Sequence, residues 1–208
     1  MLFLDELAEF APHVLDALRQ PLEEGVIRVR RARFSATLPA RVLLVAAMNP
    51  CPCGEAGRPG ACRCPEGLLT RYRRRLSGPL LDRFDLRVDV ARPQVDKLLG
   101  GEPGESSASV AARVLRARAA AAGRGVRANA ELHGSALERS APLAEDAAEL
   151  LGDALRAGRL SARGLARVRR VSLTLADLCG HDGPLTAELV ATALALRSDV
   201  ASAPGVAA

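Results

Sequence analysis

The 208-residue chain has very few aromatic side chains: it contains no tryptophan, one tyrosine and four phenylalanines. Hydrophobic residues still make up 49% of the sequence, which is enough to form a core. That core must therefore be aliphatic and built from leucine, valine and alanine. A chain of this length has room for one large domain or for two small ones.

Long hydrophobic runs are also missing. No apolar stretch reaches the roughly 18 residues that a transmembrane helix needs. The N-terminus has no basic segment of the kind that opens a signal peptide. We therefore expect no membrane partner and a cytoplasmic location.

Lysine is almost absent, because the net charge of +5 rests on 28 arginines and the single Lys97. An arginine-rich, lysine-poor chain is typical of GC-rich coding DNA, so its charge permits an anionic partner without requiring one. No glycine pattern precedes Lys97. The sequence therefore contains no G-x-x-x-x-G-K-[ST] loop, the motif that holds the phosphates of a bound nucleotide in P-loop proteins.

The chain begins with a short apolar run that ends in two carboxylates, Leu2-Phe3-Leu4-Asp5-Glu6. This pattern is typical of a Walker B strand, in which residues 2–4 would form a buried parallel strand. Asp5 would hold the Mg²⁺ of Mg-ATP and Glu6 would polarise the attacking water. The alternative is an ordinary strand or helix end with solvated acids. A Walker B strand without a P-loop predicts the later half of an ATPase domain.

Periodicity predicts alternating helices and strands in the first part of the chain and helices alone in the second. The first part has an expected helix at 8–20, a hairpin of 26–30 with 34–38, strands at 41–48 and 86–90, and a basic helical stretch around 71–75. A flexible linker by composition follows at 100–107. Helices are expected at about 108–122, 143–157, 161–179 and 186–198, with Ser161 and Thr186 as N-caps.

Four segments together carry a family resemblance. They are Leu2-Phe3-Leu4-Asp5-Glu6-Leu7, Ala17-Leu18-Arg19-Gln20-Pro21-Leu22-Glu23, Val45-Ala46-Ala47-Met48-Asn49-Pro50-Cys51-Pro52-Cys53-Gly54 and Ser77-Gly78-Pro79-Leu80-Leu81-Asp82-Arg83. In order and spacing they resemble the YifB/ComM family of magnesium-chelatase-like AAA+ ATPases. The third segment is the most specific, and the resemblance covers about residues 1–198.

The resemblance implies an α/β fold: a partial AAA+ P-loop NTPase core, from Walker B onward, followed by an all-helical lid. The core would occupy 1–92, a linker and connecting helix 93–126, a lid of the magnesium-chelatase C-terminal type 127–200, and a tail 201–208. Family members also carry a Lon-protease-like domain and a P-loop, which this sequence lacks. We expect a misassigned start, a frameshift or a genuine truncation.

The resemblance also assigns roles to polar residues beyond the Walker B strand. Asn49 would be sensor 1, which orients water near the γ-phosphate; the alternative is a turn-forming asparagine before a proline. Arg83 would be an arginine finger that acts on the neighbouring subunit's nucleotide. Its alternative is a local pairing with Asp82 or Asp85.

In the lid, Arg163 resembles sensor 2, which couples the position of the lid to the nucleotide. Arg167 lies one helical turn further on and is a rival for that role. The alternative for both is a side chain that is simply exposed to solvent. The hairpin arginines, Arg28, Arg30, Arg31 and Arg33, resemble the pre-sensor-1 hairpin, which would grip a DNA backbone in the pore of a hexamer. Their alternative is a solvated loop in an arginine-rich protein.

Four of the five cysteines form a C-x-C-x₈-C-x-C pattern at Cys51, Cys53, Cys62 and Cys64. Four thiolates suit tetrahedral Zn²⁺. The spacing is shorter than the usual C-x₂-C, so free thiols or a labile disulfide stay open as alternatives. Cys179 is expected in the core.

The resemblance implies a hexameric ring that hydrolyses ATP with Mg²⁺ and drives DNA helicase or branch-migration work in recombination or natural transformation. The alternatives are ATP-driven remodelling of a protein partner and a truncated, non-catalytic module for assembly or DNA binding. Without a P-loop, the chain by itself is expected to be inactive.

Overall fold

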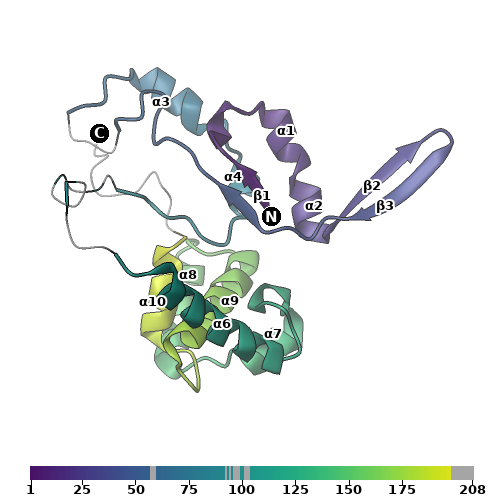
Figure 1. Ribbon diagram of the computed structural model, residues 1–208, viewed down its shortest axis with the longest axis vertical. Coiled ribbons are helices and arrows are strands. Elements are labelled where there is room, and N and C mark those ends of the chain that lie inside the picture. Colours follow the sequence, from purple (N-terminus) through teal and green to yellow (C-terminus); the bar gives the residue numbers. More distant parts are fainter. Residues whose placement is uncertain (57–59, 92, 94, 96–98, 101–103, 198–208) are drawn as a thin grey trace. The chain divides into compact units, whose positions relative to one another are not determined.

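The structure, a computed structural model, describes residues 1–56, 60–91, 93, 95, 99–100 and 104–197. The chain divides into two compact units, whose described parts are residues 1–84 and 85–197 (Figure 1). The expected tail, 201–208, and part of the expected linker lie outside the described residues. The mixture of strands in the first unit and helices in the second confirms the α/β class.

The first unit contains a parallel pair of short strands, β1 (Leu2–Leu4) and β4 (Leu44–Ala46). Leu2 pairs with Leu44 and Leu4 with Ala46. Both strands were expected, although β4 is shorter than the predicted 41–48. Because parallel strands need a long crossover, everything from η1 to β3 forms the connection between them.

The predicted helix at 8–20 is divided into three pieces: η1 (Leu7–Glu9), α1 (Pro12–Ala17) and α2 (Arg19–Glu24). Pro21 explains the break between α1 and α2, because it has no N–H to donate to the carbonyl one turn earlier. Leu7, Leu15, Leu76 and Leu80 form the buried core of this unit. Leu76 follows the helix α3 (Glu66–Arg73), and Leu80 lies in the helix α4 (Gly78–Leu81).

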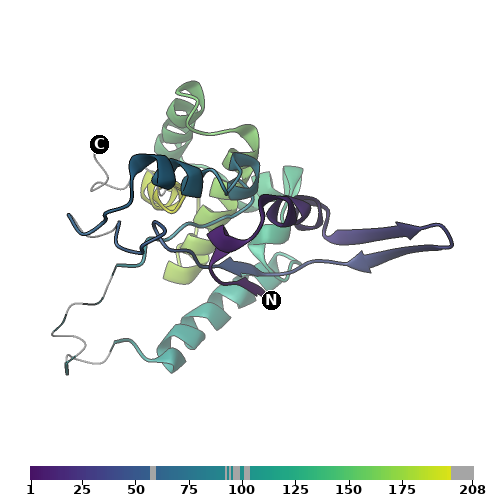
Figure 2. The same ribbon diagram turned by 90° about the horizontal axis from the view of Figure 1, so that it is seen from above.

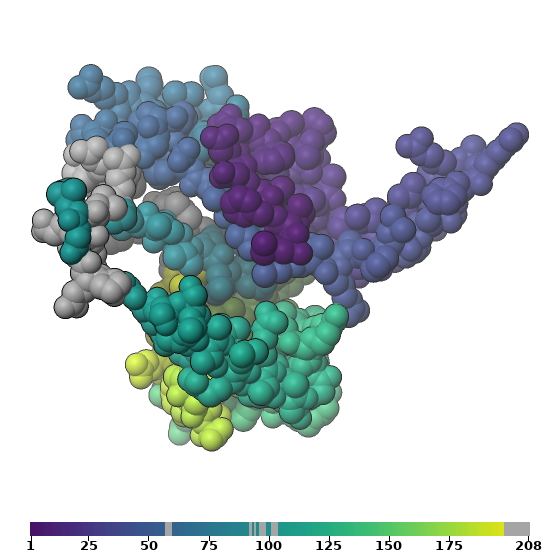
Figure 3. Space-filling model, in the orientation of Figure 1, coloured from purple at the N-terminus to yellow at the C-terminus, as the bar shows by residue number. Residues whose placement is uncertain are grey.

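The predicted hairpin is confirmed as β2 (Val26–Arg31) and β3 (Phe34–Pro39), joined by the two residues 32–33. It projects from the rest of the first unit as a two-stranded arm (Figures 1, 2 and 3). Arg28 faces Thr37 and Arg30 faces Ser35 across the ladder. Directly opposed residues share a face, so one face of the arm carries two arginines beside small hydroxyl side chains.

The described part of the second unit is helical. Its elements are α6 (Ser107–Gly123), η2 (Asn129–Glu131), α7 (Gly134–Ser140), α8 (Glu145–Arg156), α9 (Ala162–Cys179) and α10 (Ala187–Ala195). Ser161 accepts a hydrogen bond from the Gly164 amide at 3.0 Å, and Thr186 from the Leu189 amide at 3.5 Å, so both predicted caps are confirmed. The core position predicted for Cys179 is wrong, because this last residue of α9 is exposed. None of the helices in the described residues has the length and apolar character needed to cross a bilayer.

The strand predicted at 86–90 is wrong, because this segment forms no regular element. Its alternating apolar side chains are all exposed: Leu86 at 49%, Val88 at 65% and Val90 at 89%. The Arg87 amide donates to the carbonyl of Leu196, just after α10, at 2.6 Å. Alternation is a strand signal only when a neighbouring strand receives the backbone hydrogen bonds, and among the described residues this segment has none.

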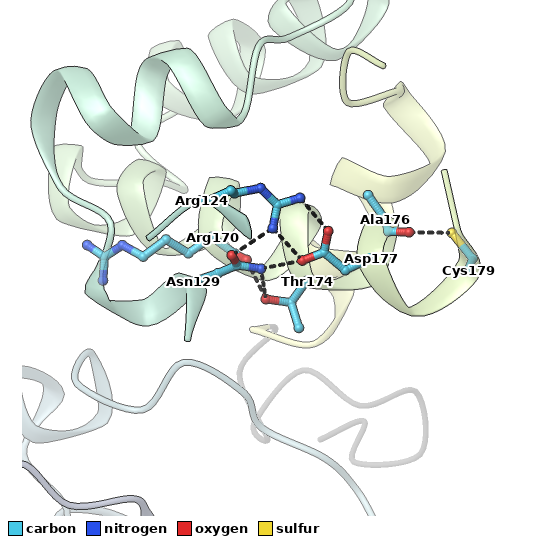
Figure 4. Close-up of polar contacts among 7 residues, drawn as sticks. All are labelled: Arg124, Asn129, Arg170, Thr174, Ala176, Asp177 and Cys179. Atoms are coloured by element: carbon cyan, nitrogen blue, oxygen red, sulfur yellow. Dashed lines mark hydrogen bonds and ion pairs between the residues drawn. The ribbon is translucent and has the colours of Figure 1, made fainter. Parts of the chain in front are cut away.

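A buried polar network ties α6 and η2 to α9 in the second unit (Figure 4). The Arg124 guanidinium donates to Asp177 and, at 3.1 Å, to the side-chain oxygen of Asn129. The Asn129 amide in turn donates to Asp177 at 2.7 Å and to Thr174 at 3.1 Å. The side chain of Asp177 is only 4% exposed, so its charge depends on these donors. The bond to Asp177 raises the pKa of Arg124.

We predict that Asp177→Ala lowers the free energy of unfolding by about 3 kcal/mol, because it leaves a part-buried guanidinium without its counter-ion. Asp153→Ala is the matched control: Asp153 pairs with Arg156 on the exposed side of α8, where both side chains are more than 60% exposed. Exposed pairs contribute at most about 1 kcal/mol. Urea unfolding followed by circular dichroism measures both, and equal losses would contradict the role given to the network.

Candidate nucleotide site and cysteine cluster

The carboxyl ends of β1 and β4 bring three of the predicted site residues, Asp5, Glu6 and Asn49, to one edge of the sheet. Asp5 and Glu6 follow β1 directly, and Asn49 follows β4 by three residues. The Ala47 amide donates to the Leu4 carbonyl at 2.9 Å, and the Leu7 amide donates to the Ala47 carbonyl at 2.9 Å. Ligands in open α/β sheets bind at this edge, outside the carboxyl ends of the strands.

Asp5 and Glu6 form a tight, exposed turn at the end of β1. An oxygen of the Asp5 carboxylate accepts the Glu6 amide at 2.9 Å. Glu6 has φ 51° and ψ 45°, and it is the one described non-glycine residue with a positive φ. This conformation costs roughly 1–2 kcal/mol. Such strain collects at functional sites, where it holds a side chain in a required direction. Two exposed carboxylates fit Mg²⁺, which keeps several of its waters in protein sites.

Asn49 is exposed, and its backbone carbonyl accepts a hydrogen bond from the Tyr72 hydroxyl at 3.0 Å. Tyr72, on α3, is only 6% exposed. Three residues further along, Arg75 donates to the Ala8 carbonyl at 2.7 Å and pairs with the Glu9 carboxylate at 3.0 Å. The end of α3 therefore contacts both the chain after β4 and the chain after Glu6.

Sequence reasoning missed Tyr72 and Arg75 as parts of this site. Arg75 was noticed only as one member of a basic helical stretch. A usable signal existed for Tyr72, because it is the one tyrosine of the chain and a buried hydroxyl needs a partner. Its partner, a backbone carbonyl 23 residues earlier, has no signature in the sequence.

Arg83 lies against α2 in the first unit. Its Nε donates to the Arg19 carbonyl at 3.1 Å, its Nη1 donates to the Pro79 carbonyl at 2.5 Å, and its Nη2 pairs with Glu23. The side chain is 12% exposed. The ion pair with Glu23 was not among the local pairings that the sequence suggested.

The two lid arginines differ in their surroundings. Arg163 is exposed in the first turn of α9. Arg167 is partly buried one turn later and pairs with Asp85 at 3.1 Å. Asp85 also lies close enough to Arg170 to oppose the fall in that residue's pKa, which burial causes. Arg167 is therefore part of a charged cluster within the second unit, and Arg163 is the more exposed of the two side chains.

All four predicted hairpin arginines, at positions 28, 30, 31 and 33, are exposed. Arg28 pairs with Glu24 at the base of the arm. Hydrogen bonds from Gln20 and then from Arg28 lower the pKa of the Glu24 carboxyl. This acid offsets one of the four positive charges, and it lies at the base of the arm.

The four clustered cysteines meet in space despite their short spacing. Their sulfur atoms all lie within 4.8 Å of one another, and none is in a disulfide. The Sγ–Sγ distances are 3.3 Å for Cys51–Cys53, 3.7 Å for Cys51–Cys62 and 3.8 Å for Cys53–Cys62. Zn–S bonds of about 2.3 Å in a tetrahedron place sulfurs about 3.8 Å apart. The donor set and its dimensions therefore fit one zinc ion.

Proton sharing within the cluster favours a mixture of thiol and thiolate. A backbone hydrogen bond from Glu55, followed by the thiols of Cys51 and Cys64, lowers the pKa of Cys53 to about 6. The hydrogen bond with Cys53 is the main cause that raises the pKa of Cys64 to about 12. A second thiolate is disfavoured beside the first unless a cation compensates the charge, which is what a bound metal does.

Comparison with known proteins agrees with this arrangement. Residues 1–98 match the family described as magnesium chelatase, subunit ChlI, and residues 104–197 match the family described as magnesium chelatase, subunit ChlI C-terminal. Together the two matches cover nearly the whole chain. The chain belongs to the magnesium-chelatase-like family that includes ComM and YifB.

Individual relatives agree with this family. The chain is 45% identical to the competence protein ComM of Haemophilus influenzae over 182 residues, which are 87% of this chain and 36% of that protein. It is 45% identical to the uncharacterized protein YifB of Escherichia coli, over 88% of this chain and 36% of that protein. It is 46% identical to the uncharacterized protein Rv2897c of Mycobacterium tuberculosis, over 95% of this chain and 39% of that protein. The chain thus spans less than two fifths of the length of these relatives.

We predict that Tyr72 titrates above the ordinary tyrosine pKa of about 10. Burial is the main cause that raises its pKa, and the charges of Glu9 and Cys51 add to it. The raised pKa means that folding favours the neutral phenol. Its contribution to stability is present below the unfolded pKa and is lost as the pH rises through the folded value.

With no tryptophan and one tyrosine, the near-ultraviolet absorbance of phenolate reports Tyr72 alone. The folded chain should show a higher midpoint than the chain in urea. Equal midpoints would mean that Tyr72 is solvated in the folded protein.

Proposed function

We propose that this chain is the later part of a magnesium-chelatase-like AAA+ ATPase that uses ATP hydrolysis to move DNA. The observation that carries the proposal is the parallel pairing of β1 with β4, which places Asp5, Glu6 and Asn49 at one sheet edge. Membership of the magnesium-chelatase-like family supports a nucleotide and Mg²⁺ as the ligands of that edge. In this proposal the protein works in the cytoplasm as a hexameric ring.

Each residue of the site has a distinct role in the proposal. Asp5 holds Mg²⁺, which would neutralise charge on the phosphates. Glu6 polarises the attacking water, and Asn49 orients it. Arg83 stabilises charge at the nucleotide of the neighbouring subunit, for which it must exchange its contact with Glu23. Arg163, exposed at the start of α9, is the lid residue that responds to the nucleotide.

DNA is the proposed substrate because the projecting hairpin presents exposed arginines on a narrow, two-stranded arm. Exposed arginines bind backbone phosphates by charge, and such contacts do not depend on the base sequence. A relative that is named a competence protein supports work in natural transformation or recombination, as helicase or branch-migration enzyme. Remodelling of a protein partner is the outcome that a failed DNA test would favour.

Zinc is the third proposed cofactor, held by Cys51, Cys53, Cys62 and Cys64. Support comes from the Cys53–Cys62 and Cys51–Cys62 sulfur–sulfur distances of 3.8 and 3.7 Å, which match those of a tetrahedral four-thiolate site. A site in which all four positions are filled by protein thiolates is structural, since no position remains for water or substrate.

We predict complementation between two inactive variants in a protein extended to the length of the relatives. Glu6→Gln should keep ATP binding and lower turnover at least about 100-fold, because it removes the group that acts on water. Arg83→Ala should lower turnover about 1000-fold, the usual loss for an arginine finger. Arg73→Ala, an exposed arginine on α3, is the control.

Mixed Glu6→Gln and Arg83→Ala subunits should recover part of the activity. The Arg83→Ala subunit keeps its own Glu6 and borrows Arg83 from its neighbour. Steady-state phosphate release across a range of mixing ratios measures the effect. Absence of recovery at every ratio would contradict the action of Arg83 between subunits.

We predict that Arg28→Ala/Arg30→Ala weakens binding of single-stranded DNA and flattens its dependence on salt. Loss of two phosphate contacts should reduce the slope of log K against log[salt] by about 1.4. The double variant Arg139→Ala/Arg156→Ala removes two exposed arginines from the second unit and is the charge-matched control. Fluorescence anisotropy with a labelled oligonucleotide measures both, and equal slopes for the two variants would argue against the hairpin.

A further inference from the structure

We infer that the cysteine cluster and Tyr72 form a brace that fixes Asn49 relative to the Asp5–Glu6 turn. The inference rests on the zinc assignment in the proposed function, and it adds a role for that metal and a positioning role for Tyr72. The brace lies wholly within the first unit, and three sets of contacts define it.

The first contact set joins the metal ligands to the end of β4. Cys51 is two residues after Asn49 and is fully buried, at 0% exposure. Of the four cysteines, Cys51 is the nearest in sequence to Asn49 and the candidate catalytic edge. Bonds from the other three cysteines to a shared ion would hold Cys51, and with it the backbone that leaves β4.

The second contact set returns from the cluster to Asn49. Cys64 is followed by Pro65, the N-cap of α3, so the last ligand lies directly before that helix. Tyr72, near the end of α3, donates its hydroxyl hydrogen to the Asn49 carbonyl at 3.0 Å. Asn49 is therefore held from two directions: through the chain to Cys51, and through a hydrogen bond to a helix that begins two residues after Cys64.

The third contact set extends the brace to the Walker B side. Arg75 follows α3 and holds the Ala8 carbonyl at 2.7 Å and the Glu9 carboxylate at 3.0 Å. These residues belong to η1, which begins immediately after Glu6. Through Tyr72 and Arg75, α3 and the residues directly after it therefore contact both Asn49 and the segment that follows Glu6. In this arrangement no cysteine needs to touch a nucleotide.

A physical reason for such a brace is the weakness of the sheet at this point. Each strand has three residues, and beyond them the described backbone bonds between the two segments are few: the Leu2 amide to the Leu43 carbonyl at 2.8 Å, and the bonds of Ala47 with Leu4 and Leu7. Short pairings of this kind open easily. A four-thiolate metal site is closed and rigid, so it can supply the missing order at a distance from the chemistry.

Hydrogen exchange of this chain, with and without zinc, tests the inference. Protein purified without chelator should hold about one zinc per chain, as a four-thiolate site requires. Removal of zinc by a chelator should speed exchange at residues 44–49 and 7–9 about tenfold, and added zinc should reverse it. The hairpin at 26–39 and helix α9 are internal references that should not change.

Two variants separate the metal from the hydrogen bond. Cys62→Ser should lose zinc and show fast exchange at 44–49, whereas Cys179→Ser, outside the cluster, should do neither. Tyr72→Phe keeps the ring and the zinc but removes the hydroxyl. It should speed exchange at 44–49 about fivefold, the effect of one lost hydrogen bond.

The possible results are distinguishable. Zinc well below one equivalent would overturn the zinc assignment and the brace together. Full zinc, with exchange at 44–49 indifferent to chelation and to Tyr72→Phe, would overturn the brace alone. Faster exchange in every segment would mean general destabilisation, which also contradicts a specific brace. The ATPase proposal is judged separately, by subunit mixing.

Discussion

The parallel pairing of β1 with β4 is the interaction on which the candidate site depends. It spans three residue pairs and continues through the bonds of Ala47 with Leu4 and Leu7. Because the strands run in the same direction, both carboxyl ends reach one edge. Asn49 follows Asp5 and Glu6 by more than 40 residues in sequence, and it reaches the same sheet edge for this reason. An antiparallel pairing would place Asn49 at the opposite end of β1.

The same pairing leaves apolar surface uncovered. Phe3 is 55% exposed, Leu43 65% and Val45 38%. Parallel strands are normally buried on both faces, so these exposures are unusual for the strand type. They accord with the proposal that this chain forms one part of a larger ATPase domain. They also explain why contacts outside the sheet, from Tyr72 and Arg75, carry weight in holding the site.

Several features followed from local sequence alone. Alternation in Val26-Ile27-Arg28-Val29-Arg30 predicted the hairpin, and Ser161 and Thr186 predicted two helix starts, because each signal acts within a few residues. Alternation at 86–90 predicted a strand that does not form, since a strand also needs a neighbouring strand, which cannot be identified from local sequence. The short C-x-C spacing argued against a shared metal, yet the sulfurs of all four cysteines lie within 4.8 Å. The folding of the loop brings the pair Cys51 and Cys53 close to the pair Cys62 and Cys64. The spacing within one pair does not reveal this proximity.

The sequence by itself determined the family, the two strands that end in polar residues, the hairpin and the helical second part. The family follows from four segments in a fixed order, whereas the strands, the hairpin and the helices depend on residue type and periodicity, which are local properties. Tertiary structure alone decided that Tyr72 holds the Asn49 carbonyl, that Arg83 lies against Glu23 and that Asp177 is buried beneath Arg124. Each of those contacts joins residues more than 20 positions apart. Their partners are chosen by how helices pack, and packing is a property of the whole fold.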